Sequence, residues 1–252
     1  MIDTHSHIDM LKNPEKEIEA FLEAGVKKVI IPGVEPATFD TIIEYIDKYD
    51  CMYGALGVHP SEALKFDEAS AKKMSLLAHH PKIIAIGEIG LDYYWDKTFV
   101  ETQKKAFITQ IEIAKSLNLP IIVHDRDAHL DTFNILREEE CKNVVMHCFS
   151  GSLEFARQCV NEGWYLGIGG VVTFKNARKM KDIVREIPLE HLLLETDAPY
   201  LTPHPFRGEE NSPKYLNLIA KQIADLKDIA AEDIIRQTTK NACTLFNFDK
   251  GE

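Results

Sequence analysis

The sequence predicts an α/β protein of the (β/α)8 TIM-barrel type, built as a single domain over residues 1–252. Short apolar runs of strand length alternate with amphipathic segments of helix length along the whole chain. Eight such strand–helix units can be counted, and the length of 252 residues is close to the roughly 250 that this architecture typically uses. No linker or change of composition divides the sequence.

The predicted strands are short runs rich in Val, Ile and Leu. Lys28 to Pro32 is continuously apolar, which suits a parallel strand that is covered on both faces. In chain order the strands are expected in the opening segment and at 28–32, 52–58, 83–88, 121–124, 144–147, 165–168 and 192–196.

Helical spacing of apolar residues separates these runs. In the longest segment, Phe107, Ile111 and Ala114 recur at helical offsets. Helices are expected at 14–24, 38–48, 69–79, 98–117, 128–138, 153–162 and 177–185, with a last one from Leu216 through Ile223. A short polar and apolar tail is expected to follow the last helix.

A doubly wound open sheet is the alternative arrangement of the same elements. The first strand–helix turn lacks the Gly-x-Gly-x-x-Gly phosphate loop that marks many such folds. The closed barrel is therefore favoured.

The composition is that of an ordinary globular protein, with 45% hydrophobic and 27% charged residues. The chain starts without a basic and apolar leader, and no run approaches the ~18 apolar residues of a membrane span. A cytoplasmic protein without membrane association is expected. The five cysteines are an odd number and are widely spaced, which favours reduced thiols over a disulfide framework.

The net charge of -11 argues against a broad phosphate-binding surface. A phosphodiester substrate is still compatible with this charge, because divalent cations in a carboxylate-rich cleft supply positive charge locally.

Ionisable or imidazole side chains end six of the eight predicted strands. Active sites of TIM barrels lie at the carboxyl ends of the strands, so these side chains should meet. His5 and His7 are two residues apart, and in a strand such residues point to the same face. Each residue alone fits a capping or hydrogen-bonding role, but together they predict a metal site. The candidates are His5, His7, His59, Glu88, His124, His147 and Asp197.

His59 has no obvious place among the ligands. The other candidates, four imidazoles and two carboxylates, still exceed the ligand number of one tetrahedral zinc ion. They suit two cations ~3.5 to 4 Å apart that share a bridging carboxylate, and Glu88 is the expected bridge because it comes from the middle of the barrel. The mixture of nitrogen and oxygen ligands permits zinc, manganese, iron or nickel and is less typical of magnesium alone.

Six motifs together resemble the TatD family of metal-dependent deoxyribonucleases, which belongs to the amidohydrolase-like barrels. They are the opening His-x-His, Gly-Val-His-Pro (57–60), Gly-Glu-Ile-Gly-Leu-Asp-Tyr (87–93), Val-His-Asp-Arg-Asp-Ala (123–128), His-Cys-Phe-Ser-Gly (147–151) and Leu-Glu-Thr-Asp-Ala-Pro-Tyr-Leu (194–201). The resemblance covers essentially the whole chain.

The resemblance implies metal-dependent hydrolysis of nucleic acid, including 3′ to 5′ exonuclease action on single strands. The substrate partner would then be single-stranded DNA or RNA, and no obligate protein partner is evident. Matched position by position, the family's metal ligands fall on His5, His7, Glu88, His124, His147 and Asp197.

Two of these ligands, Asp197 and Glu88, and the neighbouring His59 are expected to take part in the chemistry. Asp197 is predicted to ligate one ion and to accept the proton of the attacking water, and Glu88 to bridge the ions. His59 is predicted to donate to a phosphoryl oxygen, with a structural hydrogen bond as the alternative. Glu195 has the strand parity of Asp197, so we expect it deeper in the barrel, where it would orient a ligand.

Substrate contacts are expected from loops around the barrel mouth. Arg207 lies in the long proline-containing segment 198–212 and suits bidentate phosphate contact. Tyr200, Phe149 and Tyr93 or Tyr94 are candidates for stacking on bases.

Two other functions fit the same residues. The same hydroxide can attack a carbonyl carbon, so hydrolysis of an ester or amide, such as the ester of a D-aminoacyl-tRNA, is the main rival. A non-catalytic binding protein on a decayed barrel is disfavoured, because competent side chains fill all six ligand positions.

Overall fold

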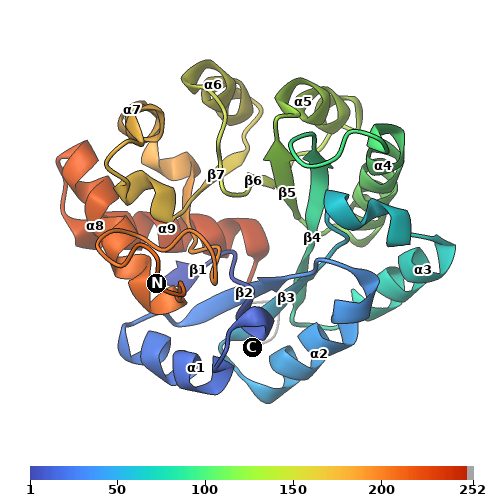
Figure 1. The fold of residues 1–252 in the computed structure, drawn as a ribbon, viewed down its shortest axis with the longest axis horizontal. Coiled ribbons are helices and arrows are strands. Elements are labelled where there is room, and N and C mark those ends of the chain that lie inside the picture. Colours follow the sequence, from blue (N-terminus) through green and yellow to red (C-terminus); the bar gives the residue numbers. More distant parts are fainter. Residues whose placement is uncertain (249–252) are drawn as a thin grey trace.

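A computed structural model describes residues 1–248 and confirms the predicted barrel. Its eight strands are all parallel and neighbour one another in the order β1 to β8, with the helices on the outside of the ring (Figure 1). The last four residues of the predicted domain lie outside the described residues. The strands are β1 (Ile2–Asp3), β2 (Lys28–Pro32), β3 (Met52–Leu56), β4 (Ile83–Asp92), β5 (Ile121–Arg126), β6 (Val144–Met146), β7 (Tyr165–Ile168) and β8 (Leu192–Leu194).

All helices but the last lie close to the predicted segments. They are α1 (Pro14–Glu23), α2 (Phe39–Lys48), α3 (Glu68–Leu77), α4 (Val100–Leu117), α5 (His129–Glu138), α6 (Leu153–Asn161), α7 (Arg178–Glu186), α8 (Leu216–Lys227) and α9 (Ala231–Phe246). Short 3-10 helices stand in the connections, among them η4 (Gly170–Thr173) and η5 (Leu189–His191).

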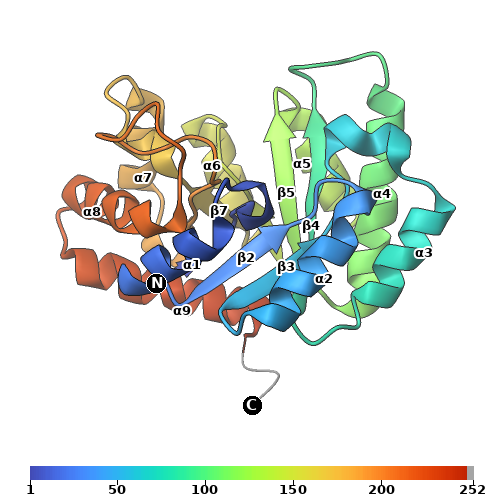
Figure 2. The same cartoon turned by 60° about the horizontal axis from the view of Figure 1, so that its bottom comes forward.

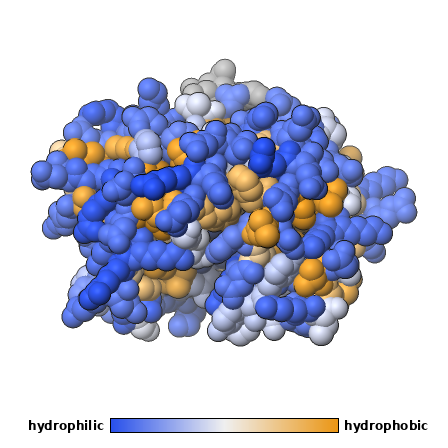
Figure 3. Space-filling view, turned by 90° about the horizontal axis from the view of Figure 1, so that it is seen from above, coloured by the Kyte–Doolittle hydropathy of each residue, from blue (hydrophilic) through white to orange (hydrophobic). Residues whose placement is uncertain are grey.

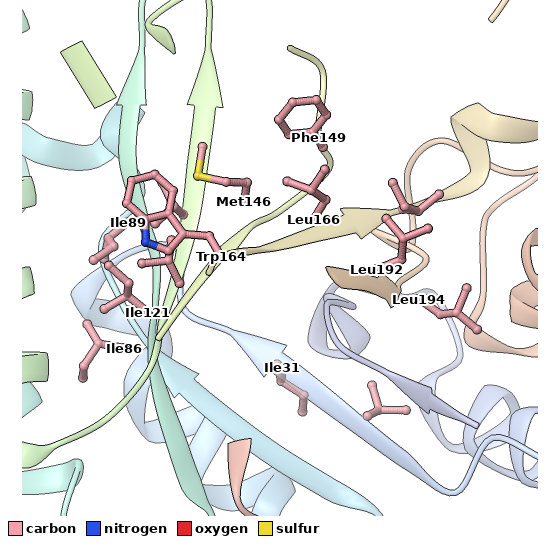
Figure 4. Close-up of a cluster of buried hydrophobic side chains, with 14 of the residues drawn as sticks. Ile31, Ile86, Ile89, Ile121, Met146, Phe149, Trp164, Leu166, Leu192 and Leu194 are labelled. Carbon is pink, nitrogen blue, oxygen red and sulfur yellow. The ribbon is translucent and has the colours of Figure 1, made fainter. Parts of the chain in front are cut away.

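Alternate residues of the strands build two separate apolar cores. Ile31 of β2 packs outward with helix residues, whereas Ile30 packs inside the barrel. Figure 4 shows part of the outer core, with side chains such as Trp164 and Met146 beside the strands. Strands buried on both faces explain the continuous apolar runs in the sequence.

The prediction of a short tail after α8 is wrong, because that segment forms the sixteen-residue helix α9. Leu245 and Phe246 of this helix, with the following Phe248, pack against inward-pointing strand residues such as Ile30 and Ile122. Figure 2 shows α9 across the amino ends of the strands. The helix therefore closes the end of the barrel opposite to the predicted site.

Backbone hydrogen bonds join β1 to the chain around β8 and close the ring. The amide of Thr4 donates to the carbonyl of Leu194 (3.0 Å), and the amide of Asp197 donates to the carbonyl of His5 (2.9 Å). The buried Asp3 carboxylate accepts from the hydroxyl and the amide of Thr196, at 2.6 and 3.0 Å. This seam fixes His5 and Asp197 beside each other.

Two strands extend beyond their predicted ends. β4 continues past Glu88 to Asp92, and β5 continues past His124 to Arg126, with Asp92 and Arg126 in register. Gly90 permits this close pairing, because a Cβ there would lie 2.0 Å from the carbonyl oxygen of His124. The extension carries additional polar side chains to the mouth of the barrel.

Within residues 1–248 no helix is long and apolar enough to cross a membrane, and no disulfide joins the cysteines. Hydrophilic residues cover most of the face in Figure 3, with hydrophobic ones dispersed between them.

Candidate metal centre

The two carboxylate oxygens of Glu88 face two different pairs of histidines. Oε2 lies 3.3 Å from His5 Nε2 and 3.9 Å from His7 Nε2. Oε1 lies 2.7 Å from His124 Nδ1 and 3.5 Å from His147 Nε2. Glu88 thus stands between the pairs, as a bridging ligand would.

Asp197 completes the group on the side of the first histidine pair. Its Oδ1 lies 3.8 Å from His5 Nε2 and 3.7 Å from His7 Nε2. The two Nε2 atoms are themselves only 3.3 Å apart. Four such atoms around one point are a cation-ligand arrangement, because neutral imidazole nitrogens that converge in this way gain little from each other.

All six predicted ligands therefore meet at the carboxyl ends of the strands, mostly buried. One potential ion site is formed by His5, His7 and Glu88, and another by Glu88, His124 and His147. Asp197 joins His5 and His147 in a third combination. The donor set fits borderline divalent cations, and Glu88 belongs to both histidine groups.

Glu195 lies behind one of the histidines, as its strand parity predicts. It is fully buried, its Oε1 lies 3.2 Å from His147 Nδ1, and it accepts from the backbone amide of Cys148 at 2.6 Å. Gly167 of β7 provides the space, since a Cβ there would lie 2.1 Å from Glu195 Oε2. A carboxylate behind a ligand histidine fixes its ring and raises its basicity.

Asp92 plays the corresponding part for His124, and the sequence reasoning missed it. Its Oδ2 lies 3.0 Å from His124 Nε2, while Gln103 of α4 holds the backbone amide and carbonyl of Asp92. Asp92 has the parity of Glu88 in the extended β4. A strand predicted as far as Asp92 would have placed this residue on the same face as Glu88.

Burial sets the protonation of several of these groups. It lowers the pKa of His7 to about 4 and that of His59 to about 3, which leaves both imidazoles neutral. Burial also lowers the pKa of His147, but Glu195 and Glu88 outweigh it and raise the pKa to about 10. Burial raises the pKa of Asp197 to about 7, against the opposing effect of His147.

His59 lies at the edge of the cluster with one nitrogen free to act on a substrate. Its Nδ1 accepts the backbone amide hydrogen of Ser61 (3.1 Å), so the proton of the neutral ring belongs on Nε2. Nε2 lies 3.7 Å from Glu88 Oε1, and the ring is 4.3 Å from that of His124. The geometry suits the donor role predicted for His59.

Two cavities meet at the metal centre. The first, of about 500 Å³, opens past Trp95 and Tyr200. The second, of about 430 Å³, extends toward α7. Both are lined by His124, Arg126, His147, Asp197 and Leu201.

Arg126 is the cation at the junction of these cavities, and the sequence reasoning assigned it no role. Its guanidinium carbon lies 3.8 Å from the ring centre of Tyr94 and 5.3 Å from that of Trp95. Arg126 shares the strand parity of His124, two residues earlier in β5. The aromatic contacts hold its planar group at the cavity wall.

Comparisons with known proteins agree with this geometry. The family model described as "TatD related DNase" matches residues 2–247. The chain belongs to the TatD family.

Its TatD relatives include an uncharacterized metal-dependent hydrolase, YabD, of Bacillus subtilis, which is 45% identical over 99% of this chain and 100% of its own length. The metal-dependent hydrolase TatD of Mycobacterium tuberculosis is 35% identical, with 96% of each chain covered. Among solved structures, the TatD homologue YjjV of Escherichia coli superposes with a TM-score of 0.94 at 33% identity and 98% coverage of both chains. This TatD-family chain is accordingly a metal-dependent hydrolase.

The substrate contacts predicted for this TatD-family chain are only partly brought to the centre. Tyr200 is 55% exposed, lines the first cavity and lies 6.3 Å from the ring of His7. Tyr94 is 53% exposed beside Arg126. Tyr93 turns away instead, since its hydroxyl donates to Asp131 at 2.7 Å.

Two predicted contacts are not supported by the geometry. Arg207 stacks on Phe174 (3.9 Å) and donates to the carbonyl of Thr202, outside the residues that line the two cavities. Phe149 is only 4% exposed, because its ring packs against Phe155 in the outer core. Phe149 therefore walls the second cavity from the core side and offers no open face for a base.

Proposed function

We propose that this protein hydrolyses phosphodiester bonds of single-stranded nucleic acid, releasing nucleotides from the 3′ end. The proposal rests on the placement of the Glu88 carboxylate. Its two oxygens face separate pairs of histidines, at distances of 2.7 to 3.9 Å. Two cations held in this way suit the in-line displacement of a phosphodiester.

Bound cations would activate water and neutralise charge on the phosphoryl oxygens. Asp197 would accept the proton of the attacking water, since its carboxylate lies mostly buried within the ligand cluster. The Nε2–H of His59 would donate to a phosphoryl oxygen. Arg126 would pair with the same or the neighbouring phosphate through its planar guanidinium.

Exposed aromatic side chains beside the first cavity favour a single strand. Trp95 is 72% exposed and Tyr200 is 55% exposed. Stacking of unpaired bases on such rings is tolerant of sequence. With a net charge of -11, the molecule would hold its substrate at this local site and not over a wide basic surface.

The test is an assay of metal-depleted protein restored with magnesium, manganese, nickel or zinc in turn. End-labelled single-stranded DNA and RNA would be compared with a D-aminoacyl-tRNA. Release of mononucleotides from the 3′ end supports the proposal. Cleavage of the aminoacyl ester with no action on nucleic acid would replace it with the carbonyl hydrolase.

A further inference from the structure

The second cavity has walls that the metal centre does not explain. It lies between the segment after β6, the 3-10 helix η4 and the start of α7. Its lining is mixed, because six apolar side chains stand beside polar and charged ones that include Asp125 and Lys179. We call it the apolar pocket after these six, which are Phe149, Val171, Ala177, Met180, Ile183 and Leu201.

The apolar pocket is continuous with the reacting centre. Asp197, His147 and His124 form its inner end, and Arg126 lies at its rim. The same four residues line the first cavity. A phosphate at the ligand cluster would therefore have one neighbouring group in each cavity.

The two cavities differ in what they offer to those groups. The first presents the exposed ring of Trp95 and the exposed Tyr200, so a chain can leave it toward solvent. The apolar pocket ends on Met180 and the fully buried Ile183. Its volume of about 430 Å³ is in the lower part of the range of small-molecule sites.

Polar groups at the edge of the apolar pocket suit a nucleoside. Lys179 and Ser150 both line it, and the Lys179 ammonium donates to the carbonyl of Ser150 at 2.9 Å, while Arg126 supplies a second cation near the phosphate position. An apolar floor with a few polar groups at the rim fits a flat base joined to a sugar phosphate.

We propose that the apolar pocket binds the 3′-terminal nucleoside of the substrate, while the remaining strand leaves through the first cavity. This inference rests on the proposed nuclease function and deepens it. A pocket with room for one terminal residue limits each hydrolysis to one nucleotide. The protein would therefore prefer the 3′ ends of its substrate to internal positions.

The test compares oligothymidylates whose 3′-terminal nucleotide carries or lacks its base. In the wild type the terminal nucleotide with a base should be released at least about tenfold faster, the size expected for one stacked or buried base. The variant Ala177→Phe, which fills the apolar pocket, should lower that rate to the rate of the abasic end. It should slow hydrolysis of the abasic end less than hydrolysis of the end that carries a base.

Ala231→Phe is the matched control, since Ala231 is also half-buried and begins a helix, α9, at the other end of the barrel. It should hydrolyse both ends as the wild type does. Val171→Phe fills the pocket from η4 and serves if Ala177→Phe does not fold. Equal rates on both ends in the wild type, or an equal slowing of both in the pocket variants, would overturn the inference.

Binding of thymidine monophosphate separates this inference from the proposed function. If the metal-loaded protein cleaves no nucleic acid, affinity for the nucleotide that falls about tenfold in Ala177→Phe and not in Ala231→Phe still supports the pocket. Unchanged affinity would overturn it. The inference would also be overturned if Ala177→Phe lost cleavage of the aminoacyl ester and nothing else, because the pocket would then hold an amino-acid side chain.

Discussion

Asp197 has a left-handed backbone conformation, with φ of 56°. Asn tolerates this conformation as well as Asp does, so Asp197→Asn should fold normally. It removes the proton acceptor and a charged ligand, and we expect kcat to fall at least about 100-fold. Steady-state hydrolysis measured beside thermal unfolding checks this. Near-normal activity with metal bound would remove Asp197 from the catalytic role.

Gly167 controls the position of Glu195 behind His147. In Gly167→Ala the new methyl would overlap the Glu195 carboxylate, so the ring of His147 should lose its support. Metal affinity should fall about 10- to 100-fold, the usual effect of losing an outer-shell partner.

Gly169→Ala is the matched control for this prediction. A Cβ at residue 169 would have its nearest contact at 3.7 Å, an ordinary packing distance. Competition with a fluorescent chelator measures both affinities. Equal affinities in the two variants would show that Glu195 does not position His147.

At the scale of single residues, Glu88, His124, His147 and Asp197 were predictable because each ends or follows a clear apolar run, whereas His5 and His7 were indicated by their spacing and by the family motif. Asp92 and Arg126 were not predicted, because the strands from Ile83 and Ile121 were expected to end at the first polar residue. The substrate contact predicted for Arg207 is not supported. The sequence does not show that the Arg207 guanidinium stacks on Phe174, away from the two cavities.

The extension of β5 gives a prediction at the scale of an element. Arg126→Ala should raise KM for single-stranded DNA about tenfold. It should also reduce the slope of log affinity against log salt concentration by about one, as expected for the loss of one phosphate contact. Arg126→Lys should recover little of the loss, because a lysine lacks the planar fork and stacks poorly.

Arg236→Ala on α9 is the control for Arg126, because this arginine is exposed and pairs with Asp233 one turn earlier. Its KM and salt dependence should equal those of the wild type. Binding isotherms at several salt concentrations decide. An unchanged salt dependence in Arg126→Ala would exclude its phosphate contact.

Helix α9 carries a prediction about stability. Phe246 is 3% exposed and packs into the amino end of the barrel. Phe246→Ala should lower the free energy of unfolding by about 3 to 5 kcal/mol. Leu76→Ala, at a side chain that is 72% exposed, should change it by less than about 0.5 kcal/mol. Urea unfolding measures both, and similar values would contradict the closing role of α9.

The sequence did not predict α9 because its buried face is partly polar. Asn241 and Thr238 are buried on it, and the Asn241 amide donates to the carbonyls of Leu189 and Leu192 at 2.8 Å each. These side chains interrupt the apolar period that identified α8. The hydrogen bonds become visible only when the end of the barrel is in place.

At the scale of the molecule, ring closure brings the first and last strands together. His5 and Asp197 come from opposite ends of the chain, yet the seam places Nε2 and Oδ1 3.8 Å apart. The alternation of strands and helices predicted this topology, because right-handed connections between parallel strands leave few arrangements. The two-cavity shape depends on side-chain packing after closure and could not be predicted.

The metal content of the purified protein tests the account most directly. Protein stripped with a chelator and dialysed against zinc or manganese should bind two cations per chain, as measured by elemental analysis. Glu88→Ala should bind fewer, because Glu88 faces both histidine pairs. One cation or none in the wild type would contradict a shared two-cation centre at the mouth of the barrel.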